Sequence, residues 1–164
     1  MKINISAQLN PIYQAMTETE KVAMNFKPIF QDFGKYYVQR IRKQFDRSVN
    51  PYDEAWTPLS QLTIKAKRQK GYSKPSKPLI ATGLSRRSIR FDARPNRLTF
   101  IFVTKYLWFH DNGTKKIPQR MVFPTEERGL DDASYNYLIE AANDYILAAW
   151  LKSEGENNSR VTSG

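Results

Sequence analysis

The sequence predicts an α+β fold, a small antiparallel sheet packed against two long helices in a single domain with extended loops. Apolar residues recur at helical spacing over residues 29–45 and again over 135–150. Between these segments, residues 86–92 and 97–103 have the alternating pattern of paired strands. Because neither a helix nor a sheet can bury its apolar face alone, we expect the helices to cover the sheet.

The first long helix is predicted by large apolar residues at every fourth position. They are Ile29, Phe33, Tyr37, Ile41 and Phe45. Pro28 suits the first turn, and Asn50-Pro51 ends the helix. The wide aromatic stripe favours core packing over a membrane-surface role. An earlier segment, residues 11–26, has a weaker helical pattern.

A short basic helix is expected next, with Ser60 as its N-cap and Gly71 as its stop signal. Residues 71–78 then hold two prolines and two lysines without apolar periodicity. We predict a mobile loop here, which becomes ordered only on assembly.

The strand over residues 97–103 is apolar on both faces. Leu98, Phe100 and Phe102 alternate with Thr99, Ile101 and Val103. Such a strand lies in the centre of a sheet or beneath a helix. Residues 94–96 supply the turn from the first strand, and residues 120–123 are compatible with a further strand.

The second long helix begins at Asp131-Asp132, whose carboxylates suit the positive end of a helix dipole. Its apolar face consists of Tyr135, Leu138, Ile139, Ala142, Ile146, Ala149 and Trp150. A glycine and several polar residues follow Ser153, so we expect residues 1–152 to form the domain and 153–164 a flexible tail.

Composition excludes several kinds of site. The 164-residue chain contains no cysteine, which excludes disulfides and thiolate metal sites and fits a reducing cytoplasm. No apolar run approaches the ~20 residues that cross a bilayer, and the N-terminus lacks a signal-peptide core, so no membrane partner is expected. One histidine, His110, and carboxylates without ligand spacing predict no catalytic residue, no cofactor and no metal site.

The net charge of +10 is distributed unevenly. Residues 35–90 hold fourteen basic and three acidic side chains, whereas residues 131–164 hold two basic and six acidic ones. A chain whose charge is separated in this way can stack head to tail on copies of itself or bind an acidic partner such as DNA. A solvated basic face is the simpler interpretation.

The segment from His110 to Arg120 is a candidate interface. An aromatic run precedes it, Gly113 favours a turn, and Pro118 fixes the backbone near the exit. This order of features suits a loop that is held out to a partner. We expect Arg120 to present its guanidinium to a carboxylate or to carbonyl groups of that partner. The candidate interface comprises His110, Gly113, Lys115, Lys116, Pro118, Arg120 and Trp56.

Three segments in the same order resemble phage virion morphogenesis proteins of the tail-completion type. Residues 56–60 read Trp-Thr-Pro-Leu-Ser, and residues 79–83 read Leu-Ile-Ala-Thr-Gly. Residues 110–120 place a histidine and a glycine before a basic loop that ends in Pro-x-Arg. The chain departs from the family pattern at Ser85, Leu107, Asp111, Gln119 and Met121-Val122.

The resemblance implies a structural subunit of a tailed-phage virion rather than an enzyme. Such proteins close the head-proximal end of the tail or join it to the connector, generally as rings and commonly with six subunits. The implied partners are copies of this chain, the tail tube, and connector or neck proteins, with assembly in the host cytoplasm. The charge is also compatible with non-specific contact with DNA in the lumen of the ring.

The alternative is a non-sequence-specific nucleic-acid-binding protein. Its contact surface would be Lys65, Lys67, Arg68, Lys70, Lys74 and Lys77. Such side chains neutralise phosphates, and Tyr72 between them can stack on a base. No base-reading motif accompanies them, so sequence-specific recognition is not expected.

Overall fold

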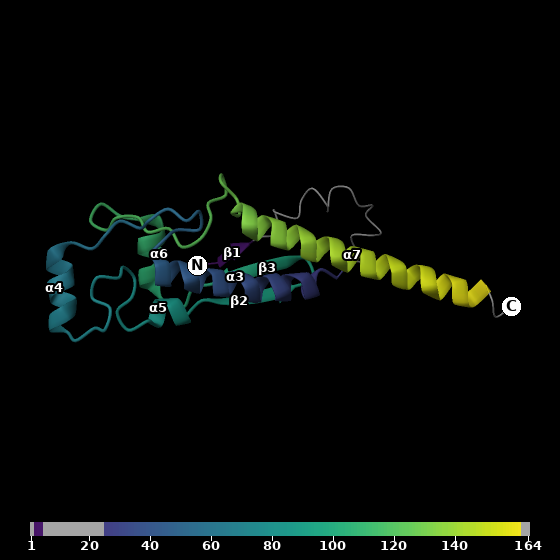
Figure 1. Ribbon diagram of the computed structural model, residues 1–164, viewed down its shortest axis with the longest axis horizontal. Helices are drawn as coiled ribbons and strands as arrows, with labels where there is room; N and C mark the ends of the chain where they lie inside the picture. The colour runs from purple at the N-terminus through teal and green to yellow at the C-terminus, as the bar shows by residue number, and fades with distance from the viewer. Residues whose placement is uncertain (1, 5–24, 162–164) are drawn as a thin grey trace.

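The computed structural model describes residues 2–4 and 25–161, so the weak helical pattern over residues 11–26 lies almost wholly outside them. The described chain is elongated, with several loops at one end and the last helix projecting from the other (Figure 1). In chain order, the elements are β1 (Lys2–Asn4), α3 (Lys27–Arg47), α4 (Gln61–Gln69), α5 (Leu84–Arg87), β2 (Arg90–Arg94), β3 (Arg97–Ile101), α6 (Lys105–Asn112) and α7 (Asp132–Val161).

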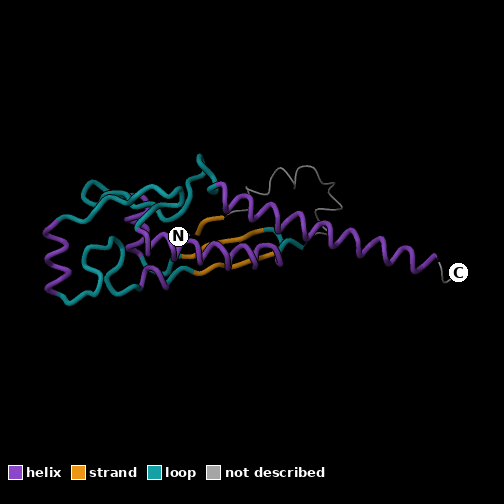
Figure 2. Tube along the Cα trace, viewed as in Figure 1, coloured by secondary structure: helices purple, strands orange, loops and turns teal. Residues whose placement is uncertain are grey.

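The sheet has three antiparallel strands in the order β1–β3–β2. β3 is central, as its two apolar faces predict. Phe100 of β3 stands opposite Ile3 of β1 and Phe91 of β2. α3 runs along the strands, and α7 packs against α3 (Figure 2). The predicted α+β class with two long helices is therefore confirmed, although α3 provides most of the cover over the sheet.

The predicted strand over residues 86–92 begins later than expected, at Arg90. Gly83 adopts a φ of 75° and opens the short helix α5, which takes up Arg86 and Arg87. Only glycine enters this conformation without a Cβ penalty, so the helical turn depends on it. The predicted strand over residues 120–123 is also wrong, because the Asp111 side chain binds the backbone N–H groups of Val122 and Phe123.

α3 forms the centre of the core. The residues at the predicted four-residue spacing are buried, Tyr37 and Phe45 completely. The helix approaches β2 closely at Gly34, where an added Cβ would lie 2.5 Å from the Phe91 ring. It ends at Ser48 in the left-handed conformation, close to the predicted stop.

α7 continues to Val161, well past Ser153, where the sequence predicts a flexible tail. Its 30 residues extend about 45 Å. Leu138 and Ala142 are buried in the core, whereas Leu147 is exposed, and the last turns project beyond the body (Figure 1). The helix therefore includes residues 153–161, and the flexibility expected of this segment stays a prediction.

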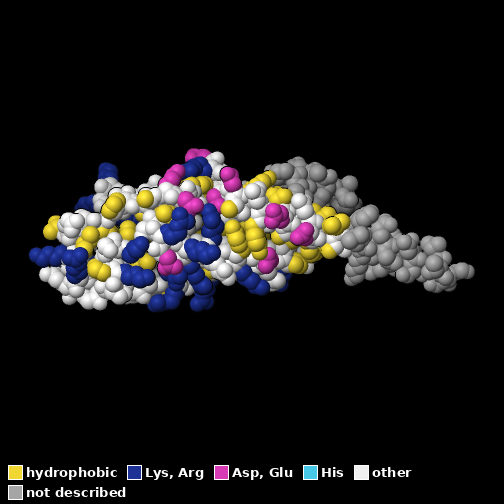
Figure 3. Space-filling model, viewed as in Figure 1, with side chains coloured by type: hydrophobic (Ala, Val, Ile, Leu, Met, Phe, Trp, Pro, Cys, Tyr) yellow, Lys and Arg dark blue, Asp and Glu magenta, His cyan; other side chains and the backbone are white. Residues whose placement is uncertain are grey.

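Charge is separated along the length of the molecule. On the face drawn in Figure 3, many Lys and Arg side chains lie over the end that carries α4 and α5. The acidic side chains in the same view lie mainly toward α7. On this face, the uneven charge of the sequence therefore places basic side chains over α4 and α5 and acidic ones closer to α7.

Candidate functional site

Arg120 is buried, with only 4% of its surface exposed. Its Nε donates a hydrogen bond to the Thr57 carbonyl at 2.8 Å, and its Nη2 donates to the Pro58 carbonyl at 3.2 Å. Its backbone N–H donates to the His110 carbonyl at 2.6 Å. The expectation that this guanidinium reaches a partner is therefore wrong, since it binds carbonyl groups of its own chain that no helix or strand satisfies.

Trp56 is also a core residue rather than an interface residue. It is 5% exposed, and its ring meets Phe45 edge to face at 5.4 Å between centroids. The indole Nε1–H donates to the Met121 carbonyl at 2.8 Å. The segment before α4 and the segment after the loop are thus joined twice, through Trp56 and through Arg120.

The side chain of Asp111 also fixes the base of the loop. Its Oδ1 accepts hydrogen bonds from the backbone N–H groups of Val122 at 2.6 Å and Phe123 at 3.2 Å. Burial raises the pKa of this carboxyl, and the two backbone hydrogen bonds lower it by less. Sequence reasoning missed this role.

His110 lies half-buried at the base of the loop, with its Nδ1 3.4 Å from Arg120 Nη1. Burial lowers the pKa of the imidazole, and the positive charge of Arg120 lowers it further. The ring is therefore mostly neutral near pH 7. The imidazole therefore contributes a contact at the base of the loop.

The tip of the loop is held by its own hydrogen bonds. The Thr114 N–H donates to the Ile117 carbonyl at 2.8 Å, and Thr114 Oγ1 accepts from the Lys116 and Ile117 N–H groups. Gly113 has a φ of 72° and faces Gln119 so closely that a Cβ would lie 3.2 Å from its backbone nitrogen. Thr114 and Gly113 therefore shape a loop whose path is defined from base to tip.

The seven candidate interface residues thus fall into three groups. Trp56 and Arg120 point into the protein, and His110 and Gly113 lie at the base of the loop. The outward-facing, exposed group is Lys115, Lys116 and Pro118.

α6 was not expected as a helix, because its aromatic run lacks a helical apolar period. Leu107 is buried, but the neighbouring aromatic rings are not. Tyr106 is 77% exposed, Trp108 45% and Phe109 40%, and the last two rings meet edge to face at 5.2 Å between centroids. Large exposed aromatic side chains next to one another mark interaction surfaces. Tyr106, Trp108 and Phe109 on α6, together with Lys115 and Lys116 in the loop that follows, are the exposed set that we call the loop face.

Lys67 does not belong to an open contact surface. Its Nζ donates to the carbonyl groups of Lys77 at 2.7 Å, Ile80 at 2.6 Å and Lys74 at 3.4 Å. Burial lowers the pKa of this amine. Because one lysine gathers three carbonyl groups, residues 71–78 have a defined path within the single chain. Whether assembly orders this loop further stays a prediction.

Two of the remaining basic candidates, Lys65 and Arg68, lie on the open helix α4, Lys70 is its C-cap, and Lys74 and Lys77 lie in the following loop. The helix has no buried residue, and Ser60 caps it by accepting a hydrogen bond from the Thr63 N–H, as predicted. Lys77 donates to the carbonyl of Asp46. In the part of the chain that the structure describes, no ion pair involves the exposed side chains of Lys65, Arg68, Lys70 and Lys74.

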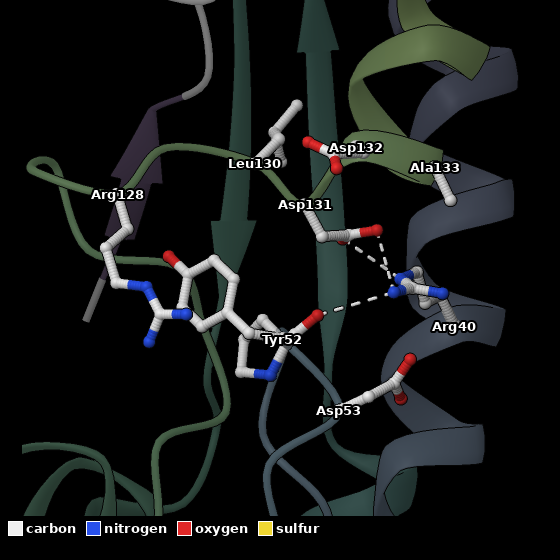
Figure 4. Close-up of a pocket in the computed structure, with 9 residues that line it drawn as sticks. Arg40, Tyr52, Asp53, Arg128, Leu130, Asp131, Asp132 and Ala133 are labelled. Atoms are coloured by element: carbon white, nitrogen blue, oxygen red, sulfur yellow. Dashed lines mark hydrogen bonds and ion pairs between the residues drawn. The ribbon is translucent and has the colours of Figure 1, made fainter.

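A mixed-charge cleft of about 510 Å³ lies where α7 begins beside α3 (Figure 4). Arg40 forms an ion pair with Asp131 at 2.7 Å and donates to the Pro51 carbonyl. Arg128 lies 3.5 Å above the Tyr52 ring. Since the charges are largely used within the chain, we interpret this cleft as the junction that fixes the start of α7.

Comparison with family models, with curated proteins and with solved structures finds no match to this chain. Among residues 2–4 and 25–161, no group of three or more His, Asp or Glu side chains is placed to hold a metal ion. No helix in that part of the chain is both long enough and apolar enough to span a membrane.

Proposed function

We propose that this chain is a structural subunit of a tailed-phage virion. In this role it forms a ring at the neck, as a tail-completion or terminator protein or as a head–tail joining protein. The proposal is supported by the resemblance of its three sequence segments to virion morphogenesis proteins. The single observation that carries it is the anchored loop, whose buried base holds Lys115 and Lys116 out to solvent.

The loop face has the properties of a protein-binding surface. Aromatic side chains provide most of the binding energy at protein interfaces, and tyrosine and tryptophan are enriched at their centres. Lysines at the rim set orientation and increase the rate of encounter. A rigid loop also loses little conformational entropy when it binds. These features favour a protein partner, with no catalytic role.

The separation of charge favours a ring. When two different surfaces of one chain meet, successive copies are joined head to tail, and the series closes if the rotation allows. The basic side chains over α4 and α5 and the acidic side chains toward α7 are two such surfaces. The tail tube and the connector or neck proteins are the proposed axial partners. DNA in the lumen is a further partner for basic side chains.

Non-specific nucleic-acid binding is the second candidate, and the open basic helix α4 favours it. Lys65, Arg68 and Lys70 are exposed and lie near Lys74 in the following loop. Four phosphate contacts would give binding that falls steeply with salt. Weak, salt-sensitive binding fits a virion subunit that touches DNA, whereas tight and salt-resistant binding favours a nucleic-acid-binding protein.

The proposed role is tested by the size of the purified protein and by the phenotype of its loss. Light scattering across a range of concentrations, followed by negative-stain imaging, is expected to reveal closed rings. Deleting the coding sequence from a phage that carries it is expected to leave heads and tails unjoined. A protein that stays monomeric, together with normal particles after the deletion, would contradict the proposal.

A further inference from the structure

We infer that the loop face of one copy docks into an acidic groove between α3 and α7 of the next copy. The inference rests on the proposed ring-forming role and specifies the two surfaces that meet. The groove has a volume of about 370 Å³, at the small end of the range for binding pockets. Its walls include Tyr137 and Tyr145, and its acidic residues are Asp32, Glu140 and Asp144.

The aromatic walls of the groove are fixed before any partner arrives. Tyr137 stacks on Tyr36 with 3.9 Å between ring centroids, and its hydroxyl donates to Asp32 Oδ2 at 2.6 Å. This hydrogen bond is the main reason that the pKa of Tyr137 is raised to about 12. The Tyr145 hydroxyl donates to the Asn25 carbonyl at 3.0 Å. A preorganised groove binds at a lower entropic cost.

The charge of the groove is not neutralised within the described chain. Asp32 accepts a hydrogen bond from a neutral hydroxyl, and no ion pair in residues 2–4 and 25–161 involves Glu140 or Asp144. On the opposing surface, Lys115 and Lys116 are exposed and also lack an acidic partner there. Three carboxylates around aromatic walls therefore complement the two ammonium groups of a loop that follows the exposed aromatic residues of α6.

The two surfaces cannot meet within one chain. The groove lies at the beginning of α3, whereas α6 and its loop lie toward the other end of that helix (Figure 1). Contact between them is therefore contact between copies, and it is heterologous, which generates a ring or an open filament. A second copy is the occupant that this complementarity favours over an unrelated ligand.

Site-specific cross-linking tests the contact directly, because the chain contains no cysteine. We would mix Lys116→Cys protein with Glu140→Cys protein and treat the mixture with a short bis-maleimide. A covalent pair between the two variants, identified by mass spectrometry, is expected. Lys70→Cys mixed with Glu140→Cys is the matched control, since Lys70 is an exposed lysine that caps the C-terminus of α4. Equal cross-linking in the control would overturn the docking.

Charge reversal is the second test of the docking. Lys115→Glu with Lys116→Glu should weaken self-association about tenfold, and Glu140→Lys with Asp144→Lys should do the same. Mixing the two reversed proteins should restore association, because opposite charges face each other again. Oligomers that persist in both variants, with no cross-link, would overturn the docking and leave the ring intact. Monomers of the unmodified protein at all concentrations would overturn the ring itself.

Discussion

The Arg120 guanidinium donates a 2.8 Å hydrogen bond to the carbonyl oxygen of Thr57, which lies 63 positions earlier in the chain. The bond fixes the base of the loop without using any residue at its tip. Different residues therefore fix the conformation of the loop and expose side chains to a partner. Buried Arg120 performs the first, and exposed Lys115 and Lys116 are free to perform the second.

Replacing Arg120 should destabilise the folded chain. Arg120→Ala removes charged hydrogen bonds to two carbonyl groups and leaves them unsatisfied, so we expect a loss of about 2–3 kcal/mol in the free energy of unfolding. Urea denaturation measures this change in the free energy of unfolding. The control, Lys115→Ala with Lys116→Ala, should stay within about 0.5 kcal/mol of the unmodified protein. An unchanged unfolding midpoint in Arg120→Ala would show that the bonds to Thr57 and Pro58 contribute little.

Asp111 should matter as a hydrogen-bond acceptor rather than as a charge. Asp111→Asn keeps an oxygen that can accept from the Val122 and Phe123 N–H groups, and it removes a carboxylate whose burial is unfavourable. We expect Asn to be at least as stable as Asp at pH 7. Asp111→Ala should lose about 1–3 kcal/mol, because two buried donors lose their partner. Equal stability of the Asn and Ala variants at pH 7 would contradict this role.

The single histidine should make stability fall in mild acid. The pKa of His110 is lowered in the folded chain, so the neutral ring is favoured there, and protonation favours unfolding. The stability that depends on a neutral His110 ring is fully present above the ordinary histidine pKa of ~6.5. It is lost as the pH falls from there toward the lowered pKa of the folded chain. Unfolding measured from pH 7.5 to 5 should therefore show a smaller decline for His110→Gln. Identical declines in the two proteins would rule out this contribution.

Lys67 should organise the 71–78 loop in the free subunit. Lys67→Met keeps an apolar stem but removes the donor to three carbonyl groups. We expect loop amides to exchange with solvent about tenfold faster in this variant. Lys70→Met, which changes an exposed lysine nearby, should leave exchange unchanged. If both variants exchange at the rate of the unmodified protein, the loop has another organiser.

The long elements were predictable because their patterns are local. The four-residue spacing in α3 and the two apolar faces of β3 each determine how one segment packs. The direction of Arg120 was not predictable, since it depends on free carbonyl groups at residues 57–58, far away in the sequence. α6 was missed because it exposes its aromatic residues, so no buried face marks it as a helix. The end of α7 was not predictable, because its last residues are polar and have no apolar period that would mark a helix.

Cryo-electron microscopy of the neck of a phage that carries this gene tests the proposed role most directly. We expect a ring of density at the head–tail junction into which this fold fits, with residues 113–119 at the contact between neighbouring subunits. Particles whose neck is fully accounted for by other proteins, with this chain absent, would contradict the proposal.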